Sequence, residues 1–376
     1  MATTDAPSWS CPSNVSLLVD RILGDLQRPL WPLLLLEFGV SAGGNGVALW
    51  RLWRWGARPW APPAVLSAQL ALSHLLLALT LPPQAAYLAP PKHWRHGAIA
   101  CRLERFLAAA NVLGGAVFTA AIGLTRYLGV AHPFFTRGRL RPRHAWAASA
   151  GGWALSALLA APTLHFSRLQ DSRCSGPGFF ENHTCIKCLD SAGDHHLEAF
   201  QAYRLALAVL GCGVPLLITV ASWGGLVRAL VRSPGLARAE KLRVGALVAA
   251  GGALFAGSYV PYHALLLLNL GARRAWLHRC RGFEDEAQVV RLLDRGTYAG
   301  YQVSRVLLPL AGCLHPLLYL AAVPGLCGGA SQPPAAPAPD RLLWKQGSVS
   351  EAPPPGPLLW KQGGADTRGP QHLRGT

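Results

Sequence analysis

Long runs of this chain contain no charged residue, and they constrain its fold more than any other feature. Five runs lack Asp, Glu, Lys and Arg altogether, and two more carry a single charged residue each. The seven runs are Pro29–Trp50, Ala61–Pro91, Phe106–Thr125, Ala145–Ser167, Leu205–Val227, Val244–Ala272 and Gly296–Pro339. A helix that crosses a bilayer needs about 20 mostly apolar residues. The runs therefore predict an all-α membrane protein, a seven-transmembrane helix bundle surrounded by membrane lipid.

Positive charge gathers in alternate connecting segments. Segments 51–58, 126–143 and 228–243 carry Arg and Lys with almost no acid, whereas many of the acidic residues fall in segments 171–198 and 284–294. Basic segments beside transmembrane helices usually face the cytoplasm, so we expect an extracellular N-terminus and a cytoplasmic C-terminus. The excess of 35 Lys and Arg over 18 Asp and Glu then reflects topology in large part, and we expect no nucleic-acid partner.

The same pattern divides the chain into three parts. We expect an extracellular N-terminal segment at 1–29, a seven-helix transmembrane domain at 30–325 and a disordered cytoplasmic tail at 326–376. The first segment lacks the apolar core of a cleavable signal peptide, so the first helix should act as a signal anchor. Two glycosylation sequons, at Asn14 and Asn182, both fall on the predicted outer side.

The cysteines fit this topology. Six of the nine lie in segments expected outside the cell, where disulfides persist: Cys11, Cys101, Cys174, Cys185, Cys188 and Cys280. Six cysteines allow 15 pairings, and their spacing does not choose among these. Cys212 and Cys313 fall within predicted helices, where small core residues are expected. Cys327 follows the last predicted helix, and the sequence is consistent with either a palmitoylated cysteine or a free thiol at this position.

Polar side chains within the predicted helices are the functional candidates, because a polar group in hydrocarbon is costly unless it is paired or faces a cavity. They are Glu37, Asn45, His74, Arg105, Asn111, Arg126, His263, Arg305 and His315. Arg105 lies one turn beyond Cys101, and Arg305 lies near the outer end of the seventh run. Both arginines are therefore expected near the outer surface.

An outer cavity with two arginines, aromatic rings and a histidine suits a polyanion that carries a planar ring. The guanidinium fork binds phosphate oxygens, and Tyr259, Tyr262 and His263 share one helix face around Pro261. The alternative is that both arginines pair with extracellular acids as structural clamps. Residue types alone support the two interpretations equally.

Several short motifs resemble the rhodopsin class of G-protein-coupled receptors over about residues 30–325. They are Gly44-Asn45, Leu70-Ala71, Cys101, Thr125-Arg126-Tyr127, Trp153, Pro215, Pro261 and His315-Pro316-Leu317-Leu318-Tyr319. Other stretches resemble the metabotropic purinoceptors, which sense extracellular nucleotides: Cys101-Arg102-Leu103-Glu104-Arg105-Phe106, Ser258-Tyr259-Val260-Pro261-Tyr262-His263 and Tyr301-Gln302-Val303-Ser304-Arg305. Longer runs, such as Pro90-Pro91-Lys92-His93-Trp94-Arg95 and Cys185-Ile186-Lys187-Cys188, resemble the ATP-preferring eleventh subtype.

This resemblance implies a multi-pass plasma-membrane receptor, not an enzyme, with no cofactor and an extracellular ATP-like agonist. The implied ligand-binding residues are Arg105, Tyr262, His263, Gln302, Arg305 and Asp190. Asp190 would pair with Arg305 when the site is empty. The implied disulfides are Cys101–Cys188 and Cys11–Cys280, which leaves Cys174 and Cys185 as a third pair.

The resemblance also implies coupling to heterotrimeric G proteins of the Gq and Gs classes. These would act on phospholipase C and calcium, and on adenylyl cyclase and cyclic AMP. Arg126, Tyr127 and Tyr319 are the residues implied to act in G-protein coupling.

Four residues depart from the class pattern. His74 stands where the class almost always has an Asp that binds sodium, and Thr125 stands where most receptors have Asp. Trp223 replaces the usual Tyr, and Leu266 occupies a position where nucleotide receptors usually have Lys or Arg. Losing that third cation should weaken phosphate binding.

The histidine at position 74 leads to a further expectation about the inner half of the bundle. If the class packing holds, His74, His315 and Asn45 lie near one another and form a hydrogen-bonded network without formal charge. The alternative is that His74 simply bonds to a backbone carbonyl.

Other functions can be weighed against the receptor interpretation. A transporter needs internal repeats and broken helices, and seven spans with unlike polar residues show no such repeat. An intramembrane hydrolase needs a paired nucleophile and base, and Glu37 has no obvious carboxylate partner. Asp194-His195-His196 lacks a fixed ligand spacing, so we expect no metal site. The main alternative is a receptor of the same fold that has lost nucleotide selectivity or signals constitutively.

Overall fold

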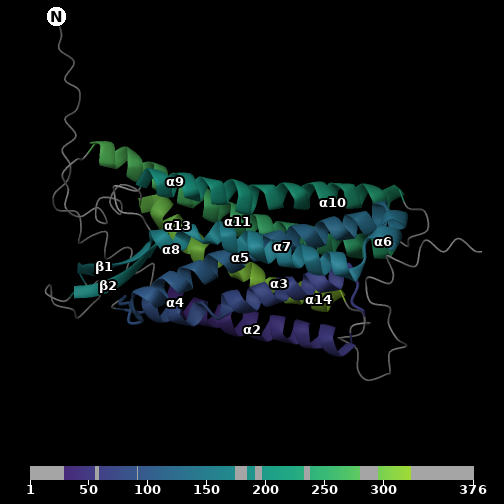
Figure 1. The fold of residues 1–376 in the computed structure, drawn as a ribbon, viewed down its shortest axis with the longest axis horizontal. Helices are drawn as coiled ribbons and strands as arrows, with labels where there is room; N and C mark the ends of the chain where they lie inside the picture. Colours follow the sequence, from purple (N-terminus) through teal and green to yellow (C-terminus); the bar gives the residue numbers. More distant parts are fainter. Residues whose placement is uncertain are drawn as a thin grey trace, which may run out of the picture.

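The computed structural model describes residues 29–55, 59–90, 92–173, 184–190, 197–232, 238–279 and 295–322 as an elongated bundle of helices (Figure 1). The helices are α2 (Leu30–Trp55), α3 (Pro62–Ala78), α4 (Leu81–Leu88), α5 (Gly97–Ala131), α6 (Pro133–Arg139), α7 (Pro142–Ala160), α8 (Pro162–Phe166), α9 (Leu197–Ala206), the π-helical η2 (Leu207–Gly213), α10 (Val214–Arg232), α11 (Arg238–Arg279), α13 (Arg295–Leu307) and α14 (Leu310–Ala322).

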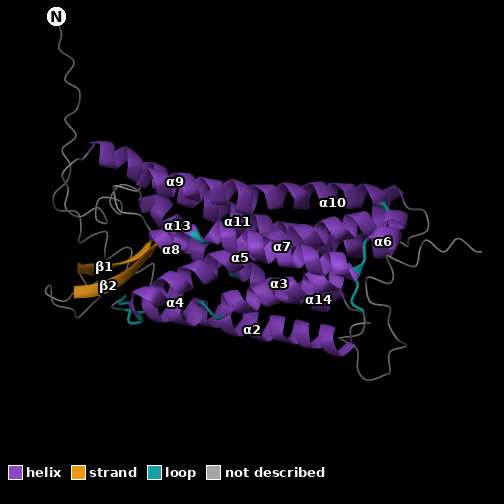
Figure 2. Ribbon diagram, viewed as in Figure 1, coloured by secondary structure: helices purple, strands orange, loops and turns teal. Residues whose placement is uncertain are grey.

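A two-stranded antiparallel sheet lies at one end of the bundle, and the short helix α6 lies at the other (Figure 2). The strands are β1 (Ser167–Arg173) and β2 (Thr184–Asp190), with Leu169 opposite Cys188. We call the two ends the hairpin end and the α6 end. The described fold is mostly helical, as predicted, and this small hairpin is the exception. A search for uncharged runs does not detect it, because both seven-residue strands carry charged residues.

Among the described residues, six helical stretches are long and apolar enough to cross a membrane. They are Leu30–Arg54, Pro62–Leu88, Gly97–Ala131, Pro142–Phe166, Glu198–Arg232 and Ala249–Gly271. The seventh predicted span is divided into α13 and α14 by a turn at Leu308 and Pro309. Each of these two helices has 13 residues, which is short of a full crossing, so the seventh span stays a prediction.

Helix α5 is the central element of the bundle, and it packs against α3, α7 and α10. Its 35 residues span about 52 Å at the usual helical rise, so α5 links the hairpin end to the α6 end. Gly115 lets α11 approach closely, because a Cβ there would lie 2.9 Å from the Tyr259 hydroxyl. That hydroxyl donates a hydrogen bond to the Val112 carbonyl at 2.9 Å and joins the two helices.

Prolines mark where the helices begin and where they deform. Proline occupies one of the first two positions of α3, α4, α6, α7 and α8, where its missing N–H is not needed. Pro261 lies inside α11 and Pro316 inside α14. Pro215 follows the wider π-helical turn η2, and such turns change the direction in which the preceding residues face. This turn therefore helps to set how α9 faces the bundle.

Candidate functional site

The hairpin of β1 and β2 is fastened to the helix bundle by a disulfide. Cys101 at the start of α5 is bonded to Cys188 of β2, as predicted. Around this bond, Tyr87 and Trp94 form a buried cluster with the two cysteines, and the Trp94 backbone N–H donates to the Ile186 carbonyl at 2.8 Å. These contacts hold β2 over the region where α4 and α5 meet. The cavity described below lies just beneath this covering.

The remaining cysteine predictions are only partly within the described residues. Cys185 is also disulfide-bonded, with a partner that lies outside the described residues. Cys11, Cys174 and Cys280, like the glycosylation sites Asn14 and Asn182, fall outside the described residues. Cys212 and Cys313 are buried free thiols, as expected for small core residues.

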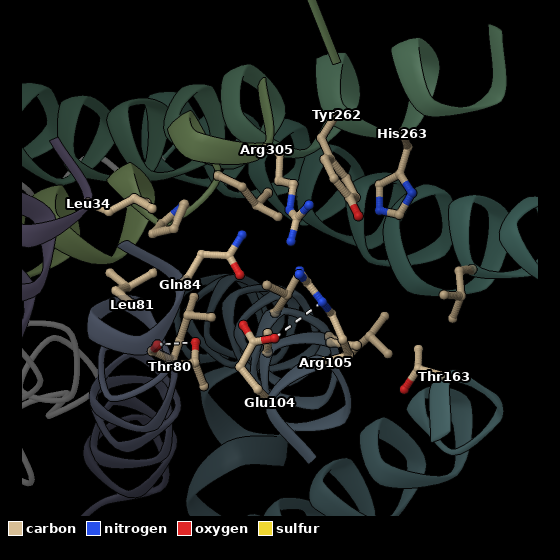
Figure 3. A pocket seen from close by; sticks show the side chains of 18 of the residues that line it. Leu34, Thr80, Leu81, Gln84, Glu104, Arg105, Thr163, Tyr262, His263 and Arg305 are labelled. Atoms are coloured by element: carbon tan, nitrogen blue, oxygen red, sulfur yellow. Dashed lines mark hydrogen bonds and ion pairs between the residues drawn. The ribbon is translucent and has the colours of Figure 1, made fainter. Parts of the chain in front are cut away.

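A cavity lies between the helices near the hairpin end (Figure 3). The cavity itself has a volume of about 110 Å³, which is smaller than the roughly 300–1,000 Å³ of most small-molecule sites. Its charged lining consists of three arginines and one carboxylate, namely Arg105, Arg204, Arg305 and Glu104. Helices α5, α9 and α13 each contribute one arginine. The cavity is therefore rich in positive charge.

Arg105 is held by a neighbouring acid and by the hairpin. Its Nε lies 3.2 Å from Glu104 Oε2, and the two side chains are 5% and 8% exposed. Its Nη2 donates to the Cys188 carbonyl at 3.4 Å, so the disulfide that anchors the hairpin also places an acceptor beside this arginine. The predicted position of Arg105 one turn beyond Cys101 is confirmed.

Gln84 of α4 connects Arg305 to the same carboxylate. With its amide oriented to satisfy both neighbours, it donates to Glu104 Oε1 at 3.1 Å and accepts from Arg305 Nη2 at 2.8 Å. Figure 3 shows Arg305 and Arg105 pointing toward each other from opposite walls, with Gln84 beside them. Glu104 thus acts on both arginines, on one directly and on the other through an amide. The acid that pairs with Arg105 comes from within the helix bundle. The alternative in which the arginines act as structural clamps expected an extracellular acid instead.

Tyr262 and His263 line the cavity wall that α11 provides. Their rings meet edge to face with centroids 5.0 Å apart. His263 is 8% exposed, and both ring nitrogens are buried without a hydrogen-bond partner among the described residues. The ring points toward the cavity in Figure 3. A buried imidazole with two unused nitrogens is prepared to bond to an incoming polar ligand.

Two other predicted ligand residues are not placed in the cavity. Gln302 is half-buried on α13 but does not line it. The backbone of Asp190 pairs with Ser167 in the hairpin, and its side chain falls outside the described part of the structure. The predicted pairing of Asp190 with Arg305 therefore stays a prediction.

Sequence reasoning missed three polar residues that line the cavity: Gln84, Glu104 and Arg204. Gln84 lies within an uncharged run and was not counted among the polar candidates. Arg204 immediately precedes the run that begins at Leu205 and served only as its boundary. Counting the charged residues within one turn of each run would have brought out both Glu104 and Arg204.

Leu266 is buried against other apolar groups rather than beside the cavity. It is 4% exposed and packs with Phe200, Leu270 and Tyr301. A leucine is consistent with that apolar cluster. The position at which nucleotide receptors usually carry a cation is therefore part of the apolar packing between α9, α11 and α13.

The residues expected to couple to G proteins lie toward the α6 end of the bundle. Arg126 and Tyr127 are half-buried on α5, and the Tyr127 ring packs edge-on against His132. The Thr125 hydroxyl donates to the Ile122 carbonyl at 3.0 Å. No ion pair joins Arg126 to another described residue. Tyr319 belongs to α14, but its side chain lies outside the described part.

A second polar group is packed between α2, α3 and α14, away from the cavity. His74 and His315 stack with ring centroids 5.1 Å apart and an interplanar angle of 12°. Asn45 donates to the Gly312 carbonyl at 2.9 Å, and a Cβ at Gly312 would lie 3.2 Å from the His74 ring. The predicted proximity of the three polar side chains is confirmed, and we call them the histidine layer.

The predicted hydrogen-bonded network in this layer was wrong. The two rings stack, and the Nδ1 atoms of His74 and His315 have no hydrogen-bond partner within the described residues. Asn45 bonds to backbone and to Ser41 instead. A hydrogen bond between two imidazoles needs a ring nitrogen of one to point at a ring nitrogen of the other, and nearly parallel stacked rings do not provide that geometry.

A metal site receives no support from the described part of the chain, where no group of three or more His, Cys, Asp or Glu side chains could hold an ion. Asp194, His195 and His196 fall outside it. The chemistry of the cavity therefore rests on the arginines, the carboxylate and the aromatic groups described above.

The fold and its motifs match a known receptor class. Residues 44–319 match the family described as 7 transmembrane receptor (rhodopsin family), and the chain belongs to this family of multi-pass plasma-membrane receptors, which are not enzymes.

The most informative relatives are purinoceptors. The chain is 56% identical over 330 residues to purinoceptor 11 of Homo sapiens, covering 87% of this chain and 88% of the relative. It is 32% identical over 293 residues to purinoceptor 1 of Gallus gallus, covering 77% and 74%. It is 31% identical to purinoceptor 1 of Rattus norvegicus, covering 77% and 72%.

Proposed function

We propose that this chain is a cell-surface receptor for an extracellular ATP-like nucleotide. The observation that carries the proposal is the cavity, where three arginines converge with only one carboxylate among the residues that line it. A polyphosphate carries several negative charges at neutral pH, and guanidinium groups bind phosphate oxygens through paired hydrogen bonds. The names of the purinoceptor relatives agree with a purine ligand.

In this proposal, Arg105 and Arg305 bind the phosphates and His263 donates a hydrogen bond to the ligand. The Tyr262 ring stacks on the base. Gln302 and Asp190 lie outside the inner cavity lining, and we assign them to its outer rim. Binding would exchange the Glu104 and Gln84 contacts of the arginines for contacts with phosphate.

The proposed topology follows the charge pattern of the sequence. Seven spans within residues 30–325 place the hairpin end and segment 1–29 outside the cell, and tail 326–376 inside. Asn14 and Asn182 are then glycosylated, and Cys11–Cys280 and Cys174–Cys185 form outside. Coupling to Gq and Gs through Arg126, Tyr127 and Tyr319 is the most specific part of the proposal. It rests only on the resemblance of the sequence to the metabotropic purinoceptors.

The test is a response assay in cells that lack nucleotide receptors. ATP should raise calcium and cyclic AMP through the wild-type receptor, and Arg305→Ala should lower ATP potency at least tenfold, since a hydrogen bond between charged groups contributes about 1.5–3 kcal/mol. Surface expression is measured in parallel. Unchanged ATP potency in Arg305→Ala at normal expression would refute the assignment of this cavity.

Constitutive signalling is a second candidate, and one observation favours it. Thr125 bonds to its own helix, and no described residue forms an ion pair with Arg126. The G-protein side of α5 therefore lacks a described electrostatic restraint. Basal cyclic AMP that rises with receptor number, measured with an enzyme that degrades released ATP, would support this candidate.

A further inference from the structure

Arg204 brings a third buried cation to the cavity from α9, directly before the uncharged run that begins at Leu205. Its side chain is 4% exposed and lines the cavity together with Arg105 and Arg305. Its guanidinium carbon lies 4.9 Å from the Phe200 ring centroid and 5.9 Å from that of Tyr203. These are cation–π distances, so the two rings hold the charged group against the cavity wall.

The support beneath Arg204 is itself rigid. Phe200 is 1% exposed and meets the Phe166 ring edge to face at 5.2 Å. The Tyr203 hydroxyl donates to the Leu159 carbonyl at 3.0 Å. Both rings are thereby fixed to neighbouring helices. An arginine held on such a surface loses little further freedom when it binds an anion, which favours tight binding.

The charge balance of the cavity points to a ligand with several negative groups. Glu104 is the one carboxylate that lines it, and it contacts Arg105 directly and Arg305 through Gln84. Arg204 adds a positive charge from a separate wall. A polyphosphate chain carries several negative groups, and it would offer charge-assisted hydrogen bonds to the arginines on all three walls.

Leu266 and Arg204 are linked through one ring. Leu266 packs in the same apolar cluster as Phe200, and Phe200 lies under the Arg204 guanidinium. The two side chains therefore contact the same ring, one from α11 and one from α9. Of the two, Arg204 lines the cavity, and Leu266 packs in the apolar cluster behind it.

We propose that Arg204 is the third phosphate-binding cation of this receptor, supplied from α9, and that it makes affinity depend on the length of the polyphosphate chain. This inference rests on the proposed function and deepens it. A triphosphate would contact all three arginines, whereas a diphosphate would use fewer of these contacts.

The experiment compares ATP and ADP potency for wild type, Arg204→Gln and Arg204→Lys at measured surface expression. Arg204→Gln should lower ATP potency about tenfold or more and ADP potency about threefold, because the lost contact is charge-assisted. Arg204→Lys keeps the charge but not the fork, so its ATP potency should be intermediate. If Arg204→Gln fails to reach the surface, the ATP-to-ADP ratio of Arg204→Lys decides the question.

Arg274→Gln is the matched control. Arg274 lies on α11 and is 47% exposed in an ion pair with Glu198, and it does not line the cavity. Its loss changes net charge equally and should leave both potencies within about twofold, because exposed ion pairs contribute little.

The outcomes separate this inference from the proposed function. A normal ATP response in Arg204→Gln together with a lost response in Arg305→Ala would overturn the role of Arg204 and leave the receptor assignment standing. An equal loss for ATP and ADP in Arg204→Gln would also overturn it, because a merely structural arginine gives that pattern. A wild-type receptor that ignores nucleotides would overturn both.

Discussion

Two of the regions in which the bundle buries polar side chains are organised in different ways. The cavity near the hairpin end holds three arginines and a glutamate, arranged through ion pairs and an amide bridge. The histidine layer holds imidazole and amide side chains. His74 stacks on His315, and Asn45 donates a hydrogen bond to the Gly312 carbonyl. One region is organised by charge and the other by packing.

The difference indicates what each region can do. Ion pairs in the cavity can be exchanged for contacts with an incoming anion, because the anion replaces the carboxylate as partner. The histidine layer offers no such exchange, and a tightly packed layer transmits displacement from one helix to the next. The cavity is therefore suited to exchange its polar partners, and the histidine layer is suited to hold α2, α3 and α14 together.

Breaking the covering of the charged region should have the largest effect. Cys101→Ser removes the disulfide that fastens β2 over the cavity, and we expect surface delivery to be abolished, since loss of a structural disulfide often prevents folding. Cell-surface antibody staining measures this. Cys313→Ser, which alters a buried free thiol beside the histidine layer, should still be delivered. Normal staining for Cys101→Ser would show that the hairpin packs without its bond.

Removing the Glu104 carboxylate from the cavity should raise ATP potency rather than lower it. Glu104→Gln keeps the shape of the side chain but deletes the carboxylate that competes with phosphate for Arg105. We expect ATP potency to rise by about threefold to tenfold, a gain on the order of 1 kcal/mol. Concentration–response curves at matched expression provide the measurement.

Glu198→Gln is the control for this gain. Glu198 is 76% exposed and pairs with Arg274 outside the cavity, so its loss should leave ATP potency nearly unchanged. A fall in ATP potency in Glu104→Gln would mean that the carboxylate positions Arg105 for the ligand instead of competing with it.

The smallest effect is expected for sodium at the histidine layer. Imidazole nitrogen is a poor ligand for a hard cation such as sodium, which prefers oxygen ligands. We therefore expect agonist affinity to be the same in sodium and in an impermeant organic cation at constant ionic strength, which controls for screening. A sodium-specific loss of affinity that disappears in His74→Ala would contradict the contrast between the two regions.

Several particular features could be predicted from the sequence. The Cys101–Cys188 bond, the placement of Arg105 one turn deeper and the proximity of His74 to His315 all agree with expectation. The hairpin was missed, because its two strands are short and carry charged residues, so they fall almost entirely outside the uncharged runs. The stacking within the histidine layer was missed as well, because sequence spacing does not determine the orientation of rings on different helices.

The sequence by itself determined which stretches become long apolar helices, and six of these in the described part of the chain are long enough to cross a bilayer. That is possible because the free energy of moving about 20 residues into hydrocarbon is a sum over the segment itself. Only the tertiary structure decided that Arg204 of α9 faces the same cavity as Arg105 and Arg305, while Leu266 packs into an apolar cluster. Which side chains meet depends on the rotation of each helix and on side-chain packing between helices, and neither is encoded in any single segment.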